Sequence, residues 1–214
     1  AALNVSGQFT PLTQGFDLTA TGETTDLAIG DPRADAILAG ITQLETTAVR
    51  DEDGLRIDLT TLESDAASLT GAASLRSGGS SATLNGRLNE TSIVLPGLNG
   101  PSDITIAGQE DDTRDWTVNA TLDAPALTAR VDGLIGNIYD LPTVQGELQA
   151  SSPDLSVFSE LAGRDVTGQL SVNAEGGANA DLTRILVDAT LRARDVTGAD
   201  LGVDRLLQGP VTLE

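Results

Sequence analysis

The side chains of this chain that could do chemistry are carboxylates gathered at two expected hairpin turns. They form the runs Asp-Glu-Asp at residues 51–53 and Glu-Asp-Asp at residues 110–112, which are candidates for general acid–base catalysis or Ca²⁺ binding. The two aspartates of the first run and Gly54 fit a calcium-loop pattern, but Val49 and Thr60 occupy its first and last ligand positions. Acidic residues are common in turns, so we interpret both runs as solvated hairpin tips and expect no metal site.

The composition excludes several other classes of function. The chain has no His and no Cys, which rules out Ser-His-Asp and Cys-His catalysis and the usual zinc sites. The pair Gly78-Gly79 lacks the Lys and the helix that follow the glycines of a phosphate-binding loop. With 12 Lys and Arg against 32 Asp and Glu, the net charge of −20 repels phosphate backbones, so we expect no nucleic-acid partner. The sequence therefore predicts neither an enzyme nor a cofactor.

Large side chains are scarce in this chain of 214 residues. Aromatic residues make up only 2% of it, although they carry much of the burial energy of a compact globule. The apolar residues are mostly Leu, Val, Ile and Ala, and no apolar run reaches the ~18 residues of a membrane-spanning helix. We interpret residues 1–214 as a single continuous β-repeat segment cut from a longer chain, with any anchor or targeting signal expected outside it.

Alternation of apolar and polar residues predicts β-strands along most of the chain. It is clearest at residues 116–123, which read Trp-Thr-Val-Asn-Ala-Thr-Leu-Asp. Similar stretches recur at a spacing of roughly ten residues, with a hairpin signal at Asp53-Gly54 and short strands expected around residues 93–95 and 104–106. Nearly every expected strand has one apolar face and one polar face. This pattern is typical of an all-β sandwich, barrel or solenoid.

A few short helical turns interrupt the expected strands. Ser152 can cap a helix, Pro153 suits its first turn, and Gly163 suits its left-handed end. Residues 31–40 and 206–209 are similar units. Because helical turns followed by strands recur without a domain boundary, we expect an elongated, open β-solenoid or half-pipe rather than a closed globule.

The stretch D-L-S-V-F-S-E-L-A-G-R-D-V-T-G-Q-L-S-V at residues 154–172 resembles the AsmA-like family, in its translocation and assembly module branch. Residues 31–44 and 201–213 look similar, and the tripeptides at residues 69–71 and 84–86 have the same style. The resemblance implies a long β-sheet folded into an open half-pipe, the β-taco, with a hydrophobic groove inside. It supplies no catalytic motif.

The resemblance also implies where such a chain works and with what. It implies a bridge through the periplasm, anchored in the inner membrane by a segment outside this chain. Regions that also lie outside this chain would reach a TamA-like barrel protein in the outer membrane. The family is implicated in moving phospholipids towards the outer membrane and in assembling outer-membrane proteins, so phospholipid acyl chains are the expected cargo.

The apolar faces of the strands give this expectation a physical basis. A surface of Leu, Val, Ala and Gly leaves room that aromatic side chains would fill, and each buried methylene of an acyl chain gains about 0.8 kcal/mol. The residues expected to line the groove are Leu84, Leu88, Val118, Leu122, Leu170, Val172, Val187 and Leu191.

Two other functions remain open from the sequence. A structural or adhesive stalk would pack the same apolar faces into a closed core and would bind no lipid. A polysaccharide-acting enzyme on a β-helix would need carboxylates clustered on one sheet face beside aromatic sugar platforms, and one Trp and one Tyr hardly provide these.

Overall fold

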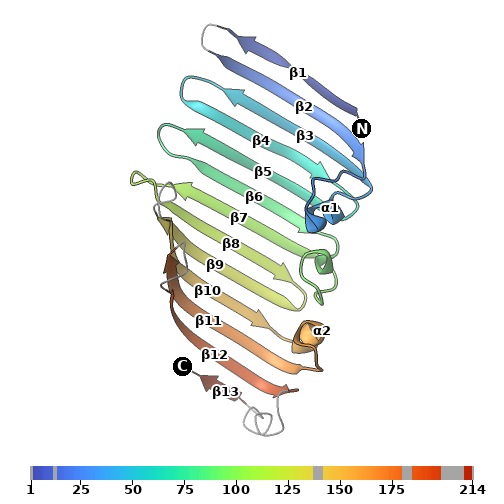
Figure 1. The fold of residues 1–214 in the computed structure, drawn as a ribbon, viewed down its shortest axis with the longest axis vertical. Helices are drawn as coiled ribbons and strands as arrows, with labels where there is room; N and C mark the ends of the chain where they lie inside the picture. Colours follow the sequence, from blue (N-terminus) through green and yellow to red (C-terminus); the bar gives the residue numbers. More distant parts are fainter. Residues whose placement is uncertain (1, 12–13, 137–141, 180–184, 199–209, 214) are drawn as a thin grey trace.

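The chain forms one open β-sheet. A computed structural model describes residues 2–11, 14–136, 142–179 and 185–198, and the backbone of residues 210–213. Thirteen strands lie side by side in sequence order, and each pairs antiparallel with the next (Figure 1). The expected all-β, elongated and open architecture is confirmed, and successive hairpins build it.

Most of the strands are 8 to 11 residues long, in keeping with the spacing of the alternating stretches in the sequence. Their bounds are β1 (Ala2–Thr10), β2 (Gly15–Thr25), β3 (Ile41–Arg50), β4 (Gly54–Glu63), β5 (Ala67–Arg76), β6 (Ser81–Leu88), β7 (Ser102–Glu110), β8 (Trp116–Ala124), β9 (Leu127–Gly136), β10 (Thr143–Ser152), β11 (Thr167–Asn179), β12 (Ile185–Thr197) and β13 (Pro210–Leu213).

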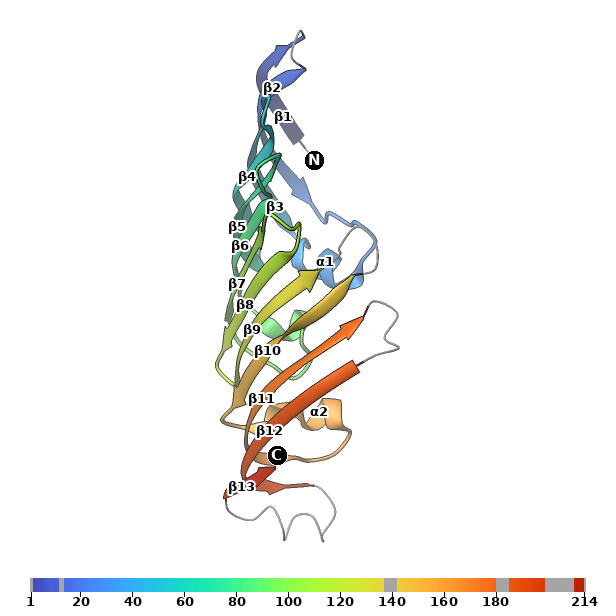
Figure 2. The same ribbon diagram turned by 90° about the vertical axis from the view of Figure 1, so that its left-hand side faces the viewer.

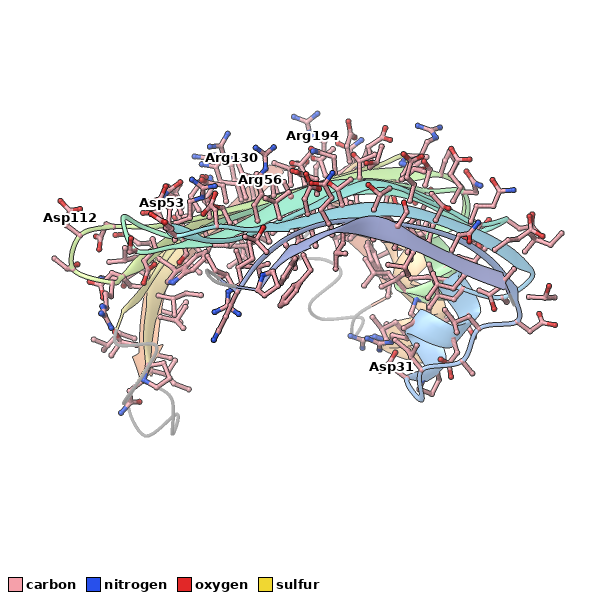
Figure 3. All side chains as sticks on the ribbon, turned by 90° about the horizontal axis from the view of Figure 1, so that it is seen from above. Asp31, Asp53, Arg56, Asp112, Arg130 and Arg194 are labelled. Carbon is pink, nitrogen blue, oxygen red and sulfur yellow. The ribbon has the colours of Figure 1, made fainter. Side chains whose placement is uncertain are left out.

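The sheet arches about its long axis, so that it has a concave face and a convex face (Figures 2 and 3). Seen from above, a helical segment with Asp31 lies under the arch. Arg56, Arg130 and Arg194 project from the outside of the arch (Figure 3). The sheet is therefore a half-pipe, and these three arginines point outwards from it.

Strand register explains this separation of the two faces. Residues directly opposite each other in antiparallel strands project to the same face of the sheet. Leu62 lies opposite both Leu44 and Leu69 on the concave face, whereas Arg130 lies opposite Thr121 and Gln149 on the convex face. The alternation within each strand is thus carried from strand to strand, and it produces apolar rows that cross the whole sheet.

A helical connection recurs after every fourth strand, along the side of the sheet where the even-numbered strands end. The segment α1 (Pro32–Ile37) follows β2, the 3₁₀ helix η1 (Thr91–Ile93) follows β6, and η2 (Leu155–Phe158) with α2 (Ser159–Ala162) follows β10. All of them lie on the concave side (Figure 2). We call this edge the helical rim.

An acidic side chain caps the start of each helical connection. The carboxylate of Asp31 accepts from the Ala34 N–H at 2.9 Å, that of Glu90 from the Ser92 N–H at 3.2 Å, and that of Asp154 from the Ser156 N–H at 2.9 Å. These bonds satisfy backbone donors that a helix start leaves free.

The observed connections correct two details of the sequence interpretation. The strand predicted around residues 93–95 is wrong, because this stretch belongs to η1 and the turn after it. Three residues are too few to distinguish the period of a helix from that of a strand. Ser152 is not the cap and Pro153 does not lie in the first turn, because Asp154 caps η2, and the Ser152 hydroxyl donates to the Asp154 carbonyl at 3.0 Å. Gly163 does end its helix in the left-handed region, with φ 66°. The unit predicted at residues 206–209 lies outside the described residues.

The buried apolar core of the described residues is confined to the helical rim. Its side chains are Ala67, Leu88, Leu98, Ala124 and Leu155. Hydrogen bonds join successive connections there: the Ser64 hydroxyl donates to the Ile37 carbonyl at 2.7 Å, and the Asn89 amide donates to the Asp65 carbonyl at 2.9 Å. In the part of the chain that the structure describes, no helix has the length and apolar character to cross a membrane.

Candidate functional site

The concave face carries a continuous apolar surface across the sheet. One row of directly paired residues runs from β3 to β12: Leu44, Leu62, Leu69, Gly86, Ile104, Leu122, Ala129, Ala150, Val172 and Leu191. The row beside it runs from β4 to β12: Leu59, Gly71, Leu84, Ile106, Ala120, Val131, Leu148, Ala174 and Ala189. Only apolar side chains and glycine occur in these stretches.

Much of this surface is open to solvent. Of the 17 exposed large apolar side chains among the described residues, 11 project from the concave face. Leu75 is 55% exposed, Val144 51% and Val187 62%. Soluble chains rarely expose apolar surface so continuously unless it binds something. The concave face is therefore the candidate functional site.

All eight residues that the sequence predicts as groove lining lie on the concave face. Six of them project into its open part: Leu84, Val118, Leu122, Val172, Val187 and Leu191. They come from β6, β8, β11 and β12, and the sheet brings them onto one surface.

The other two predicted residues lie towards the helical rim. Leu170 faces Ser152 and Ala193 and keeps part of its surface. Leu88 is only 3% exposed, and its direct partners Ala67 and Ser102 are each 1% exposed. Leu88 is therefore a core residue and lines no open surface.

Three glycines on neighbouring strands leave the backbone bare in the middle of the concave face. Gly133 in β9 faces Gly146 in β10, which faces Gly176 in β11. A Cβ added at Gly146 would lie 2.4 Å from the Asp132 carbonyl oxygen, and one at Gly176 would lie 2.4 Å from that of Leu186. The strands approach too closely here for a side chain, as a sheet that curves towards this face requires. Sequence reasoning noted the small residues but not that they adjoin.

The polar groups of Thr46 and Trp116, on the concave face, are accommodated locally. The Thr46 hydroxyl donates to the Asp58 carbonyl at 2.9 Å, beside a bulge in the pairing of β3 with β4. The indole of Trp116 lies over Gly108, where an added Cβ would be 3.1 Å from its ring. Both groups therefore present mainly carbon to the concave surface.

The convex face carries the charged network. The Arg130 guanidinium pairs with Asp132, which also accepts a hydrogen bond from the Asn119 amide. These hydrogen bonds hold the pKa of Asp132 below its usual range, and the same partner raises the pKa of Arg130. Such exposed ion pairs add little stability. They make this face charged and hydrated.

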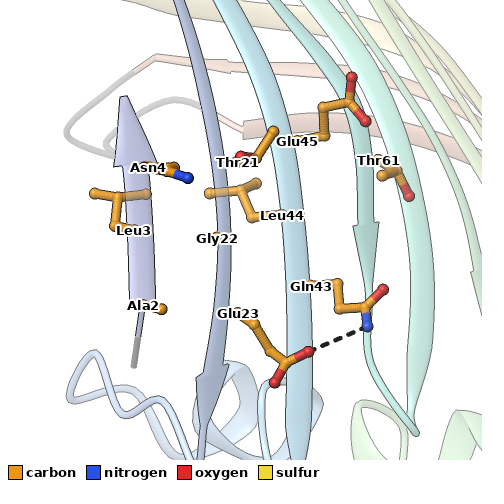
Figure 4. A pocket seen from close by; sticks show the side chains of 10 residues that line it. All are labelled: Ala2, Leu3, Asn4, Thr21, Gly22, Glu23, Gln43, Leu44, Glu45 and Thr61. Carbon is orange, nitrogen blue, oxygen red and sulfur yellow. Dashed lines mark hydrogen bonds between the residues drawn. The ribbon is translucent and has the colours of Figure 1, made fainter. Parts of the chain in front are cut away.

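Shallow depressions on the sheet have mixed linings, in which polar and apolar residues lie side by side. The one over β1–β4 is lined by ten residues (Figure 4). Asn4, Thr21 and Glu45 adjoin in one row of paired residues, and Gln43 donates to Glu23 at 3.4 Å in the next. Leu3, Gly22 and Leu44, which share a concave row by register, also line this depression, so its lining is mixed.

Four carboxylates lie side by side on the convex face of β9–β12. Asp132 faces Glu147, Glu147 faces Glu175, and Glu175 faces Asp188. Sequence reasoning missed this row because its members come from four separate strands. Among the residues that the structure describes, no three or more His, Cys, Asp or Glu side chains have a metal-binding arrangement.

The acidic residues at the two hairpin tips accept hydrogen bonds within their own turns. The Asp51 carboxylate accepts from the Asp53 and Gly54 N–H groups at 3.0 and 3.1 Å and pairs with Arg76 at 3.2 Å. The Asp111 carboxylate accepts from the hydroxyl and the N–H of Thr113, and these bonds lower the pKa of Asp111. Both carboxylates thus hold their own turns together.

The site therefore rests on its own geometry: an open, apolar concave face that ten strands build jointly, opposite a charged convex face. Comparisons with protein-family models, curated proteins and solved structures find no match to this chain.

Proposed function

We propose that the chain holds and conducts phospholipid acyl chains along its concave face. The single observation that carries this proposal is the uninterrupted apolar surface that runs from β3 to β12 and remains open to solvent. An acyl chain lying on it loses water contact at about 0.8 kcal/mol per buried methylene. Because the rows are continuous and contain no polar side chain, no position along them should trap the acyl chain.

The open side of the half-pipe suits the other end of a phospholipid. A headgroup can stay in water while the acyl chains lie on the concave face, so no polar pocket is needed along the path. The backbone groups of the face are already paired within the sheet, and an apolar ligand therefore leaves no buried donor or acceptor unsatisfied.

The wider setting of the proposal comes from the resemblance to the AsmA-like family. In that setting the chain is a segment of a TamB-like bridge across the periplasm, with the inner-membrane anchor and the contact to a TamA-like barrel supplied by other regions. A role in outer-membrane protein assembly belongs to the same setting. Neither an enzymatic activity nor a nucleic-acid partner forms part of the proposal.

The stalk with a closed core is the alternative. It requires the apolar rows to pack against a second layer. In the described ranges the helical connections cover only one edge of the concave face, and residues such as Val187 remain 62% exposed. This exposure favours the conduit over the stalk.

The first test is lipid extraction with photo-crosslinking. Probes at Val118 and Leu191, on the concave face, should crosslink co-purifying phospholipid, whereas probes at the convex neighbours Thr117 and Thr190 should not. A lipid-free protein with silent concave probes would favour the stalk.

A matched pair of double variants tests conduction. Val118→Asp with Leu122→Asp places two charges on the concave face of β8, and it should block lipid transfer between vesicles. Thr117→Asp with Thr121→Asp places the same charges on the convex face and should leave transfer unchanged. Circular dichroism checks that both proteins fold. Equal transfer by the two variants contradicts the proposal.

A further inference from the structure

One row of the concave face differs from the others in composition. It lies along the edge of the sheet opposite the helical rim, where the strands are joined by hairpin turns, on the side of Asp53 and Asp112 in Figure 3. Register and alternation assign to this row Phe9, Phe16, Arg50, Leu55, Leu75, Glu110, Trp116, Ile135, Val144, Ala178 and Ile185. We call it the tip row.

The tip row gathers the aromatic and charged residues of the concave face. Phe9, Phe16 and Trp116 lie in it, although the whole chain has only one Trp, one Tyr and three Phe. Among the described residues that are paired in register, only Arg50 and Glu110 place a charge on this face. Trp is enriched where an apolar phase meets water, because its ring is apolar and its N–H is polar. The tip row is therefore the boundary between the apolar surface and water.

The two edges of the concave face differ in their access to water. The buried apolar side chains of the described residues all gather at the helical rim, and they are Ala67, Leu88, Leu98, Ala124 and Leu155. In the tip row, by contrast, Leu75 is 55% exposed and Ile185 56%. A headgroup at the helical rim would have to be buried against this core, which is costly for a charged group. At the tip row it stays in water.

The width between the two edges suits the acyl chains of a phospholipid. Trp116 in the tip row and Leu122 in the apolar row nearest the helical rim lie on the same strand, β8. Their separation is roughly 20 Å at about 3.3 Å per residue, and Val118 and Ala120 continue the apolar surface between them. One leaflet holds its acyl chains within half of a hydrocarbon core of about 30 Å, or roughly 15 Å. Such chains fit between the tip row and the helical rim.

We propose that a phospholipid lies across the sheet, parallel to the strands, with its headgroup at the tip row and the ends of its acyl chains towards the helical rim. This inference rests on the proposed function and adds the orientation of the bound lipid to it. The tip row and the apolar rows both continue over neighbouring strands. The lipid can therefore pass from strand to strand without turning round.

The single tryptophan of the chain reports this orientation. The protein is loaded from vesicles of phosphatidylcholine that carries a nitroxide quencher either on the headgroup or at the end of an acyl chain, and it is then separated from the vesicles. In the unmodified chain, the headgroup label should quench the fluorescence of Trp116 more strongly than the acyl-end label, because the acyl end lies roughly 20 Å away.

Moving the tryptophan along the same strand should reverse this order. Trp116→Phe with Leu122→Trp keeps a single indole on the same face of β8 and places it near the helical rim. There the acyl-end label should quench more strongly than the headgroup label. Trp116→Phe with Leu191→Trp, in the same apolar row on β12, is a second variant of this kind. Circular dichroism checks that both variants fold.

The outcomes separate this inference from the proposed function. Equal quenching by the two labels at Trp116 and at the moved tryptophan, or the same order at both positions, would show that phospholipid binds without this orientation. Either result would overturn the inference alone. No quenching by either label at any position would mean that the concave face holds no phospholipid, and it would overturn the proposed function as well.

Discussion

Gly146 and Gly176 lie directly opposite each other in β10 and β11, on the concave face. Gly146 lies so close to β9, and Gly176 so close to β12, that an added Cβ would lie 2.4 Å from a carbonyl oxygen. The curvature of the half-pipe at this place thus depends on the absence of two side chains. The same absence widens the concave surface between Val118 and Val187.

Adding a side chain at this place should destabilise the sheet. Gly146→Val puts a branched side chain against the Asp132 carbonyl and the Gly133 Cα, and overpacking of this kind costs about 1–3 kcal/mol. Urea unfolding measures the loss. Gly78→Ala is the control, because a Cβ there meets nothing within 4 Å. Equal unfolding midpoints for the two variants would show that the close approach carries no stability.

The contact between Gly97 and Val157 should hold two helical connections together. A Cβ at Gly97 would lie 2.2 Å from the Val157 carbonyl oxygen, and Gly97 has φ 93°. Gly30 has the nearly identical φ of 92° but open space around it. Gly97→Ala should therefore cost more stability in urea unfolding than Gly30→Ala, by about 1–3 kcal/mol. If the two losses are the same, only backbone strain matters at Gly97.

Two of the predicted lining residues should respond differently to truncation. Leu88 is 3% exposed and Val187 is 62% exposed. Leu88→Ala should lower the free energy of unfolding by about 2–5 kcal/mol, as for other buried leucines, whereas Val187→Ala should change it by less than about 0.5 kcal/mol. A large loss at Val187 would mean that its side chain is packed in solution.

The four carboxylates in a row on the convex face should repel one another. Glu175 faces Glu147 on one side and Asp188 on the other, and like charges in this position are destabilising. Glu175→Gln should therefore raise the free energy of unfolding by about 0.2–1 kcal/mol, and added salt should reduce the gain. Glu63→Gln is the control, because Glu63 faces only Gln43 and Ser68. A gain that does not depend on salt would exclude charge repulsion as its cause.

The acidic caps should make stability fall in acid. Hydrogen bonds with Ser92, from its side chain first and then its backbone, lower the pKa of Glu90 from its ordinary value of 4.5. The contribution of the ionised Glu90 is therefore fully present above about pH 4.5, and it is lost as the pH falls through the lowered value. The unfolding midpoint of Glu90→Gln should lie below that of the parent at neutral pH and approach it in acid. A gap that is constant between about pH 6 and pH 3 would contradict this.

The second cap provides an independent check. The pKa of Asp154 is lowered from its ordinary value of 3.8 by hydrogen bonds with Ser156. The midpoints of Asp154→Asn and the parent should therefore approach each other only below about pH 3.8. A gap between the two midpoints that stays constant below pH 3.8 would contradict this contribution of Asp154.

The sequence by itself determined the strands and their two faces. A strand repeats every two residues, so the eight residues at 116–123 are enough to assign Val118 and Leu122 to one face and Thr117 to the other. Caps and turns are equally local, and for this reason Gly163 and the hairpin at Asp53-Gly54 were predicted correctly.

Only the tertiary structure decided which faces meet and how the sheet bends. Leu88 is buried opposite Ala67 and Ser102, which come from other strands, and its neighbours in the sequence do not show this. The adjoining Gly133, Gly146 and Gly176, like the four carboxylates of the convex face, come from separate strands whose register sets them side by side. Register and curvature arise from contacts between distant parts of the chain. Local periodicity therefore gives each strand its faces, whereas long-range pairing makes those faces one surface.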